Sequence, residues 1–262
     1  MVNIVVCIKQ VFDPEAPVSA YKVDAEAKGV ILKGIPPVLS PFDENALEAA
    51  LRIRDAHESK ITVISAGRNL SRPVLMKSLA AGADELLLLE DSAFEDMNSY
   101  ATADTLASAI RKLGQYDLIL TGRQAADTDA GVVGSGIAEI LDIPCITVAR
   151  KVELNDGKVR VERVISDGYE VVEAPLPCLI TAGNELGELR YATMQELVAS
   201  RKKPVTTWSA QELEVDPSQV RRVRLLGLFI PQKESRCEMI EGETLEEVGA
   251  NLALKLREAQ IL

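Results

Sequence analysis

The most informative stretch of the sequence is 117-DLILTGRQAADTDAGVVGSGIAEILDIPCITV-148. It begins and ends with short apolar runs, at 117–120 and 145–148, that predict buried strands. Between them, a loop with Gly131, Gly134 and Gly136 leads into a helix pattern. A strand, a loop, a helix and a second strand in this order are typical of a parallel sheet with helical crossovers.

The same alternation runs through the first half of the chain. Further apolar runs lie at 3–8, 61–65 and 85–89, and helix patterns lie at 40–56, 73–81 and 101–113. Because strands and helices alternate, the sequence predicts an α/β fold: a doubly wound, mainly parallel sheet with helices on both faces.

The ends of the predicted helices carry boundary signals. Ser40 can cap the first helix, and Pro41 suits the first helical position. Gly82 and Gly114 follow the next two helices and are typical of helix C-termini. These signals support the predicted helix boundaries.

Two regions interrupt the alternation. Residues 21–34 predict an antiparallel hairpin with a turn near Lys28, and residues 146–181 predict further antiparallel strands with turns at 155–157 and 167–168. From residue 186 onward the chain contains a basic cluster, a mixed stretch and a last helix that starts at Thr244. We therefore predict an α/β domain with inserted hairpins over 1–185, and a C-terminal, partner-binding arm over 186–262.

The composition excludes several classes of function. A formal net charge of −11 argues against a nucleic-acid surface, and no apolar run approaches the roughly 20 residues of a membrane span. The four cysteines lack the spacing of metal ligands. The single histidine, His57, has no Cys or Ser motif that it could activate, which argues against histidine-based acid–base catalysis. With no secretory signal at its start, the chain is expected to stay in the cytoplasm, with its cysteines reduced in the core.

The glycine loop predicts an anion site. It follows a strand and precedes a helix, so backbone N–H groups and the helix dipole would face the ligand. In an open parallel sheet that ligand lies beyond the carboxyl ends of the strands, where residues 7–9 and 40–43 could meet the loop. No GK[ST] or GxGxxG pattern is present, and the alternative is that the glycines serve only close helix packing.

The loop is also acidic. Asp127 and Asp129 would repel a phosphate, so we predict that they cap the helix or accept hydrogen bonds from a ribose, while Arg123 offsets their charge. No catalytic base, nucleophile or metal-ligand set lies beside the loop in the sequence. Binding without turnover is therefore the predicted task.

The stretch 161-VERVISDGYEVVEAPLPCLIT-181 resembles the signature of the beta (small) subunit of electron-transfer flavoproteins, with Ser166 where that family usually has an acid. The matching positions are Val161, Arg163, Asp167, Gly168, Glu170, Pro177, Leu179, Ile180 and Thr181. Other family landmarks occur in family order: 9-KQVFDP-14, 38-VLSPFDENALEAALRI-53, 79-LAAGAD-84, the glycine loop and 184-NELGELRYAT-193. The resemblance covers nearly the whole chain.

The resemblance implies a fold related to the adenine nucleotide alpha hydrolases and a heterodimer whose large (alpha) subunit holds the redox FAD. The small subunit would hold a structural AMP, with its phosphate at the helix after the glycine loop and its adenine near backbone groups at Cys7 and Ala66. Carried over by position, the AMP-binding residues are Cys7, Ser40, Pro41, Phe42, Asp43, Ala66, Gln124, Asp127, Thr128, Asp129, Gly131, Val132, Val133, Gly134 and Ser135.

Two alternatives remain open. In electron-bifurcating members the same pocket takes a second FAD and NADH is the donor; Ala130 and Gly131 stand here in place of an alanine–glutamine pair associated with those members, which favours AMP. The other alternative is a universal-stress-like adenine-nucleotide sensor, which would be a homodimer.

The segment 190-RYATMQELVASRKK-203 resembles the family's recognition loop, which docks an acyl-CoA dehydrogenase. Met194 takes the anchoring apolar position, and Arg201, Lys202 and Lys203 would form a basic rim; an ordinary helix with a solvated basic face is the alternative. The chain would then be an electron carrier and not an enzyme, passing electrons from fatty acid oxidation through the FAD of the large subunit. A membrane-bound quinone oxidoreductase is one candidate acceptor.

Overall fold

The computed structural model describes residues 1–26, 28–155, 157–220, 223, 225–231 and 237–261. The chain divides into two compact units, one formed by Met1–Lys22 with Val30–Leu226 and the other by Val23–Gly29 with Gly227–Leu262. The first unit contains the sheet and the candidate site.

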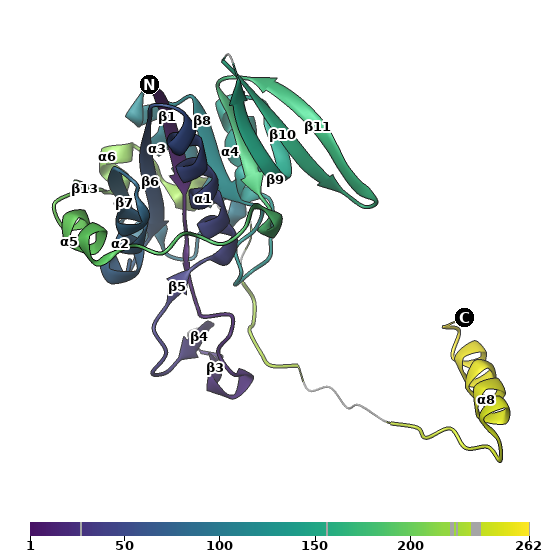
Figure 1. The fold of residues 1–262 in the computed structure, drawn as a ribbon. Coiled ribbons are helices and arrows are strands. Elements are labelled where there is room, and N and C mark those ends of the chain that lie inside the picture. The colour runs from purple at the N-terminus through teal and green to yellow at the C-terminus, as the bar shows by residue number, and fades with distance from the viewer. Residues whose placement is uncertain (27, 156, 221–222, 224, 232–236, 262) are drawn as a thin grey trace. The chain divides into compact units, whose positions relative to one another are not determined.

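Nine strands of the described residues form one sheet, in the order β11-β10-β9-β12-β8-β1-β6-β7-β13 (Figure 1). The strands from β9 to β13 along this order pair in parallel, and β10 and β11 continue the sheet antiparallel. The bounds are β1 (Val2–Cys7), β6 (Ser59–Gly67), β7 (Glu85–Glu90), β8 (Leu118–Gly122), β9 (Cys145–Asn155), β10 (Lys158–Ile165), β11 (Gly168–Pro175), β12 (Cys178–Ala182) and β13 (Val205–Trp208).

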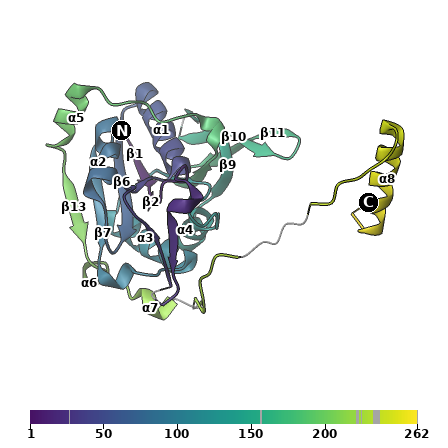
Figure 2. The same cartoon turned by 90° about the horizontal axis from the view of Figure 1, so that it is seen from below.

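Helices cover both faces of the sheet (Figure 2). On one face α1 (Pro41–Ala56) and α2 (Arg72–Ala81) share an apolar core with β1, β6 and β8. On the other face α3 (Ser99–Leu113) and α4 (Val133–Leu141) share a second core with the same strands. The predicted doubly wound, mainly parallel α/β fold is confirmed, and the helix ends at Gly82 and Gly114 are as predicted.

The strand order reverses at β1. The chain runs from β1 to β6 and β7 on one side, then returns to place β8 on the other side of β1. Cys7 at the end of β1 is paired with Ile64 of β6 and Thr121 of β8, so the carboxyl ends of the three strands meet. This switch point is where open α/β sheets bind ligands.

The prediction for residues 146–181 is partly wrong. β9, β10 and β11 are antiparallel as predicted, but β12 is a central strand that lies parallel between β8 and β9. All five residues of β12 are buried because helices cover both faces of the sheet there, so the strand is continuously apolar and its sequence gives no sign of its partners. Asp156, in the predicted turn at 155–157, lies outside the described residues.

Several short elements accompany the main sheet and its helices. β2 (Gln10–Val11) pairs with β5 (Val38–Leu39), and β3 (Tyr21–Asp24) pairs with β4 (Gly29–Leu32), which is the predicted hairpin. η1 (Val18–Ala20), η2 (Ser92–Phe94), η3 (Asn184–Leu186), α5 (Met194–Ser200), α6 (Ala210–Leu213) and α7 (Pro217–Val220) are short helices. Because β13 pairs with β7, the compact unit continues past residue 185 to Leu226.

The second unit contains α8 (Leu245–Glu258), the predicted last helix. The side chain of Thr244 caps it by accepting a hydrogen bond from the N–H of Glu247 at 3.2 Å. No residue of α8 is buried, and that this segment needs another surface stays a prediction. In the parts of the chain that the structure describes, no helix is both long and apolar enough to cross a lipid bilayer.

Candidate functional site

A cavity of about 500 Å³ lies at the switch point, within the size range of small-molecule sites. Its wall comes from the carboxyl ends of β1, β6 and β8, the loop after β8, and the first turns of α3 and α4. All of these elements belong to the first unit.

The first turn of α4 opens on this cavity. Val132, Val133 and Gly134 line the wall, and no side chain caps the helix at Val132. The first turn of a helix presents backbone N–H groups without partners inside the helix, and the helix dipole adds a partial positive charge there. The arrangement suits an anionic group of a ligand.

The three glycines of the loop differ in their surroundings. A Cβ on Gly134 would lie 2.5 Å from Thr121 Oγ1 and 2.8 Å from Thr181 Cγ2, and a Cβ on Gly136 would lie 3.0 Å from Ala103 Cβ. Gly131 has a φ of +66°, which favours glycine. Close packing therefore accounts for Gly134 and Gly136, and backbone conformation accounts for Gly131.

Asp43 is a buried carboxyl group on the cavity wall. Its two oxygens accept hydrogen bonds from the backbone N–H groups of Lys9 at 2.8 Å and Gly122 at 3.0 Å. Burial raises the pKa of Asp43 to about 7, and the charge of Asp127 adds to the rise, while the two N–H bonds oppose it. Asp43 thus fixes the first turn of α1 to the ends of β1 and β8.

The acidic residues of the loop are engaged by side chains. Lys9 Nζ donates to both carboxylate oxygens of Asp127, at 2.9 and 2.7 Å, and Gln124 Nε2 donates to Asp129 Oδ1 at 2.8 Å. The capping alternative for these aspartates is wrong, because the N-cap residue of α4 is Val132, and the ribose alternative stays a prediction. Arg123 lines the cavity. Its guanidinium carbon lies 5.0 Å from the centre of the Phe42 ring.

The structure brings most of the predicted nucleotide-binding residues together. Those in the cavity wall are Cys7, Asp43, Ala66, Gln124, Thr128, Gly131, Val132, Val133 and Gly134. Those outside the wall are Ser40, Pro41, Phe42, Asp127, Asp129 and Ser135. Ser40 is the N-cap residue of α1, as predicted, and its backbone carbonyl accepts from Asp43 N; its buried hydroxyl has no hydrogen-bond partner among the described residues.

The side of the cavity formed by α3 and by the segment just before it was not predicted from the sequence. This part of the wall contains Phe94, Asp96, Met97, Asn98, Ser99, Thr102 and Leu106. Asn98 caps α3 by accepting a hydrogen bond from Ala101 N at 2.8 Å. The segment between β7 and α3 leaves the carboxyl end of β7, which is the same edge of the sheet as the glycine loop. Its position after a predicted strand could have indicated that it reaches the site.

Only two of the four cysteines lie in the core, where all four were expected. Cys7 and Cys178 are buried, and burial raises the pKa of each to about 12; Cys145 and Cys237 are exposed, so the expectation is wrong for them. All four are free of disulfides. Within the described ranges, no group of three or more His, Cys, Asp or Glu side chains is placed to hold a metal ion.

A second candidate surface lies on α5. Met194 is 75% exposed, and Tyr191, Leu197 and Val198 are exposed beside it in the chain. The surface is hollowed where five residues meet: Met194, Gln195, Val198, Ala199 and Lys202. Neighbouring apolar side chains that remain exposed are a common feature of protein interaction sites.

The predicted basic rim of α5 is divided. Arg201 and Lys202 are exposed, as a rim requires. The ammonium group of Lys203 instead donates hydrogen bonds to the carbonyl oxygens of Leu79 at 2.9 Å, Gly82 at 3.3 Å and Ala83 at 2.6 Å. Its charge is therefore directed at the C-terminus of α2 and not at the solvent.

Comparison with known proteins shows which family the chain resembles. The electron transfer flavoprotein domain family matches residues 29–213. The chain is 40% identical to the electron transfer flavoprotein subunit beta of Thermoanaerobacterium thermosaccharolyticum, over 99% of this chain and 100% of that one. It is 39% identical to the same subunit of Megasphaera elsdenii, over 95% and 98% of the two chains. It is 37% identical to the caffeyl-CoA reductase-Etf complex subunit CarD of Acetobacterium woodii, over 99% and 100%. The chain belongs to the electron-transfer flavoprotein family and is one of its beta subunits.

Proposed function

We propose that this beta subunit keeps one nucleotide bound as a permanent component and docks a dehydrogenase through α5. It pairs with an alpha subunit that holds the redox FAD, and electrons from acyl-CoA-type dehydrogenases pass through that FAD to a downstream acceptor. The chain itself makes and breaks no covalent bond, so it is an electron-carrier subunit and not an enzyme.

The uncapped first turn of α4, which opens on the 500 Å³ cavity, carries the nucleotide part of the proposal. A phosphate at Val133 and Gly134 would receive backbone N–H groups and the positive end of the helix dipole. The adenine would lie towards Cys7 and Ala66, which are on the same wall. Lys9 and Arg123, also on the wall, supply positive charge to offset the phosphate.

AMP is the proposed nucleotide. FAD is the second candidate for the same cavity, and the wall formed by α3 favours it, because this wall extends the cavity beyond the residues expected to surround AMP. A second FAD would accompany oxidation of NADH and electron bifurcation.

The docking part of the proposal rests on α5, which we name the docking helix. Met194 is its proposed anchor, with Arg201 and Lys202 as the rim. One relative is a subunit of a caffeyl-CoA reductase-Etf complex, which supports a partner that acts on acyl-CoA compounds. A membrane-bound quinone oxidoreductase stays a candidate acceptor, and the two exposed thiols, Cys145 and Cys237, suit the reducing cytoplasm.

The nucleotide proposal is tested by co-expressing the chain with its alpha subunit, purifying the heterodimer, denaturing it and quantifying the released nucleotides. One AMP and one FAD per heterodimer support the proposal. Two FAD support the second candidate. A homodimer that releases only AMP or ATP would contradict both and favour an adenine-nucleotide sensor.

A further inference from the structure

The docking helix has little support from the protein core. It spans seven residues, Met194–Ser200, and only Ser200 is buried. Thr193 and Glu196 form a capping box, with Glu196 Oε2 2.6 Å from Thr193 N. Because so short a helix is marginal in water even with a good cap, other contacts must hold it in place.

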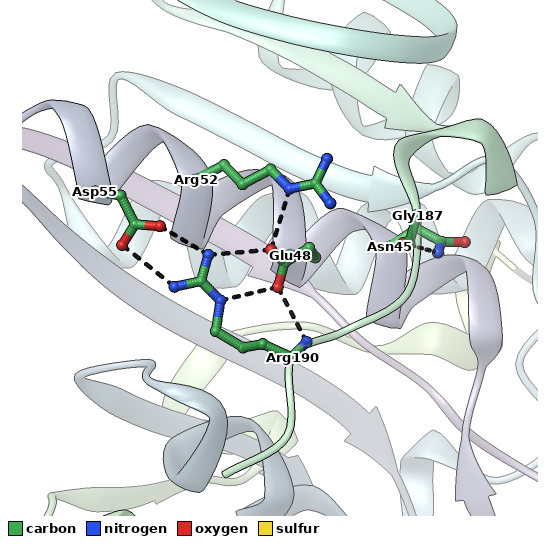
Figure 3. Close-up of polar contacts among 6 residues, drawn as sticks. All are labelled: Asn45, Glu48, Arg52, Asp55, Gly187 and Arg190. Carbon is green, nitrogen blue, oxygen red and sulfur yellow. Dashed lines mark hydrogen bonds and ion pairs between the residues drawn. The ribbon is translucent and has the colours of Figure 1, made fainter.

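Arg190 supplies the contact before the helix (Figure 3). Its Nε and Nη2 donate to the two oxygens of Glu48 at 3.0 Å each, and its backbone N–H donates to Glu48 Oε2 at 3.1 Å. Its guanidinium also donates to Asp55, at 3.2 and 2.8 Å. Both acids lie on α1, so the chain just before the docking helix is held against a core helix by five hydrogen bonds.

Glu48 on α1 is a mostly buried carboxylate that needs cationic partners. The side chain of Glu48 is only 6% exposed, and it also accepts a hydrogen bond from Arg52 Nε at 3.1 Å. Burial raises the pKa of Glu48, but the hydrogen bonds from Arg190 and Arg52 outweigh burial and keep it below its usual value. Removal of Arg190 would leave this mostly buried carboxylate with one cation in place of two, and loss of a partner from a buried ion pair is costly.

Lys203 supplies the contact after the helix. Its three hydrogen bonds go to carbonyl oxygens at the C-terminal end of α2, where a cation is favourable because the helix dipole is negative. Its backbone N–H donates to Ser200 O at 3.1 Å, which couples the lysine to the last turn of the docking helix. The docking helix is thus attached to α1 on one side and to α2 on the other.

We propose that Arg190 and Lys203 are positioning residues, which hold the docking helix in its binding orientation before the partner arrives. The inference rests on the proposed docking function. A helix that is already ordered loses less conformational entropy on binding, so the two contacts raise affinity for the partner without touching it. The competing view is that residues 191–200 become ordered only on docking.

The test uses the purified heterodimer with its nucleotides, carrying Arg190→Ala, Lys203→Met or Met194→Ala. Arg52→Ala is the matched control, because it also removes an arginine from Glu48 but does not release the segment at 190. Amide hydrogen exchange of residues 191–203 is measured, together with kcat and KM for reduction by an acyl-CoA dehydrogenase from the same organism. Nucleotide content and melting temperature show whether each variant is folded.

We expect amides of the docking helix to be protected in the unaltered protein. Protection should fall about tenfold or more in Arg190→Ala and in Lys203→Met, and KM for the dehydrogenase should rise about tenfold with kcat nearly unchanged. The Arg52→Ala control should stay within about twofold in both measurements. The split between KM and kcat separates a positioning role from general loss of structure.

The failures are distinguishable. If Met194→Ala leaves KM unchanged, the docking function itself is wrong. If Met194→Ala raises KM but neither Arg190→Ala nor Lys203→Met does, docking stands and the positioning role is wrong. Amides of the docking helix that exchange in the unaltered heterodimer at the rate of an unstructured peptide would also overturn the inference. Should one variant fail to fold, the other decides the matter.

Discussion

Asp43 Oδ1 accepts a hydrogen bond from the backbone N–H of Gly122 at 3.0 Å, which joins the first turn of α1 to the last residue of β8. The contact is close: a Cβ on Gly122 would lie 2.5 Å from that oxygen and 2.8 Å from the carbonyl carbon of Phe42. The edge of the cavity therefore depends on a buried carboxyl group whose protonation changes near neutral pH.

The first prediction concerns pH and stability. Burial raises the pKa of Asp43 from the ordinary aspartate value of 3.8 to about 7, so between these values the folded state keeps a proton that the unfolded state releases. Asp43 therefore favours folding below about pH 4, and that contribution is lost as pH rises through about 7. From pH 5 to 8 the loss should be on the order of 2 to 3 kcal/mol, measured by urea unfolding.

Asp43→Asn provides the comparison. The amide nitrogen of the new side chain cannot accept from an N–H group, whereas the hydroxyl oxygen of a protonated carboxyl group still can, so Asp43→Asn should be less stable than the unaltered protein at pH 5. The variant should also lack the fall in the free energy of unfolding between pH 5 and 8 that is attributed to Asp43. Plots of the free energy of unfolding against pH for the two proteins should therefore converge as pH rises to 8. Curves that stay parallel from pH 5 to 8 would contradict the raised pKa.

The second prediction separates two glycines of the loop. Gly134→Ala would place a Cβ within 2.8 Å of Thr121 and Thr181 and push the first turn of α4 away from the sheet, so nucleotide retention should fall at least tenfold. Overpacking of this kind costs about 1 to 3 kcal/mol. Gly136→Ala meets only Ala103 Cβ at 3.0 Å and gains about 1 kcal/mol of helix propensity, so it should keep its nucleotide. Equal nucleotide loss in the two variants would argue against the packing explanation.

The third prediction concerns the ion pair between Lys9 and Asp127, which connects the end of β1 to the glycine loop. Lys9→Met should speed nucleotide release by no more than about fivefold, because exposed ion pairs contribute roughly 0.2 to 1 kcal/mol. The difference in release rate between the variant and the unaltered protein should shrink in 1 M salt, where the Debye length is about 3 Å and exposed charges are screened. A large effect that salt does not change would indicate that Lys9 contacts the nucleotide directly.

Much of the fold could be predicted because its signals are local. Ser40, Pro41, Gly82 and Gly114 mark helix ends in the sequence, and all four are found at those ends. The parallel position of β12 could not be predicted in the same way, because its pairing with β8 and β9 depends on segments far away in the chain. A fully buried strand is apolar throughout, whichever strands it pairs with.

The site shows the same division. The glycine loop and its helix could be recognised from adjacent residues, whereas the wall of α3 comes from a segment whose polar residues are also explained by capping, as Asn98 shows. The basic cluster after the docking helix gave no sign that Lys203 turns towards α2. Whether a lysine faces solvent or a helix end depends on tertiary packing.

We propose that the retained nucleotide and the docking of a dehydrogenase belong to separate surfaces of this chain. The direct measurement is anaerobic stopped-flow reduction of the heterodimer's flavin by an acyl-CoA dehydrogenase, with Met194→Ala compared with the unaltered protein and nucleotide content assayed in the same samples. Met194 is 75% exposed and does not line the nucleotide cavity. We expect kcat/KM to fall at least tenfold while every nucleotide stays bound. An unchanged rate, or loss of the nucleotide of the beta subunit in the variant, would contradict it.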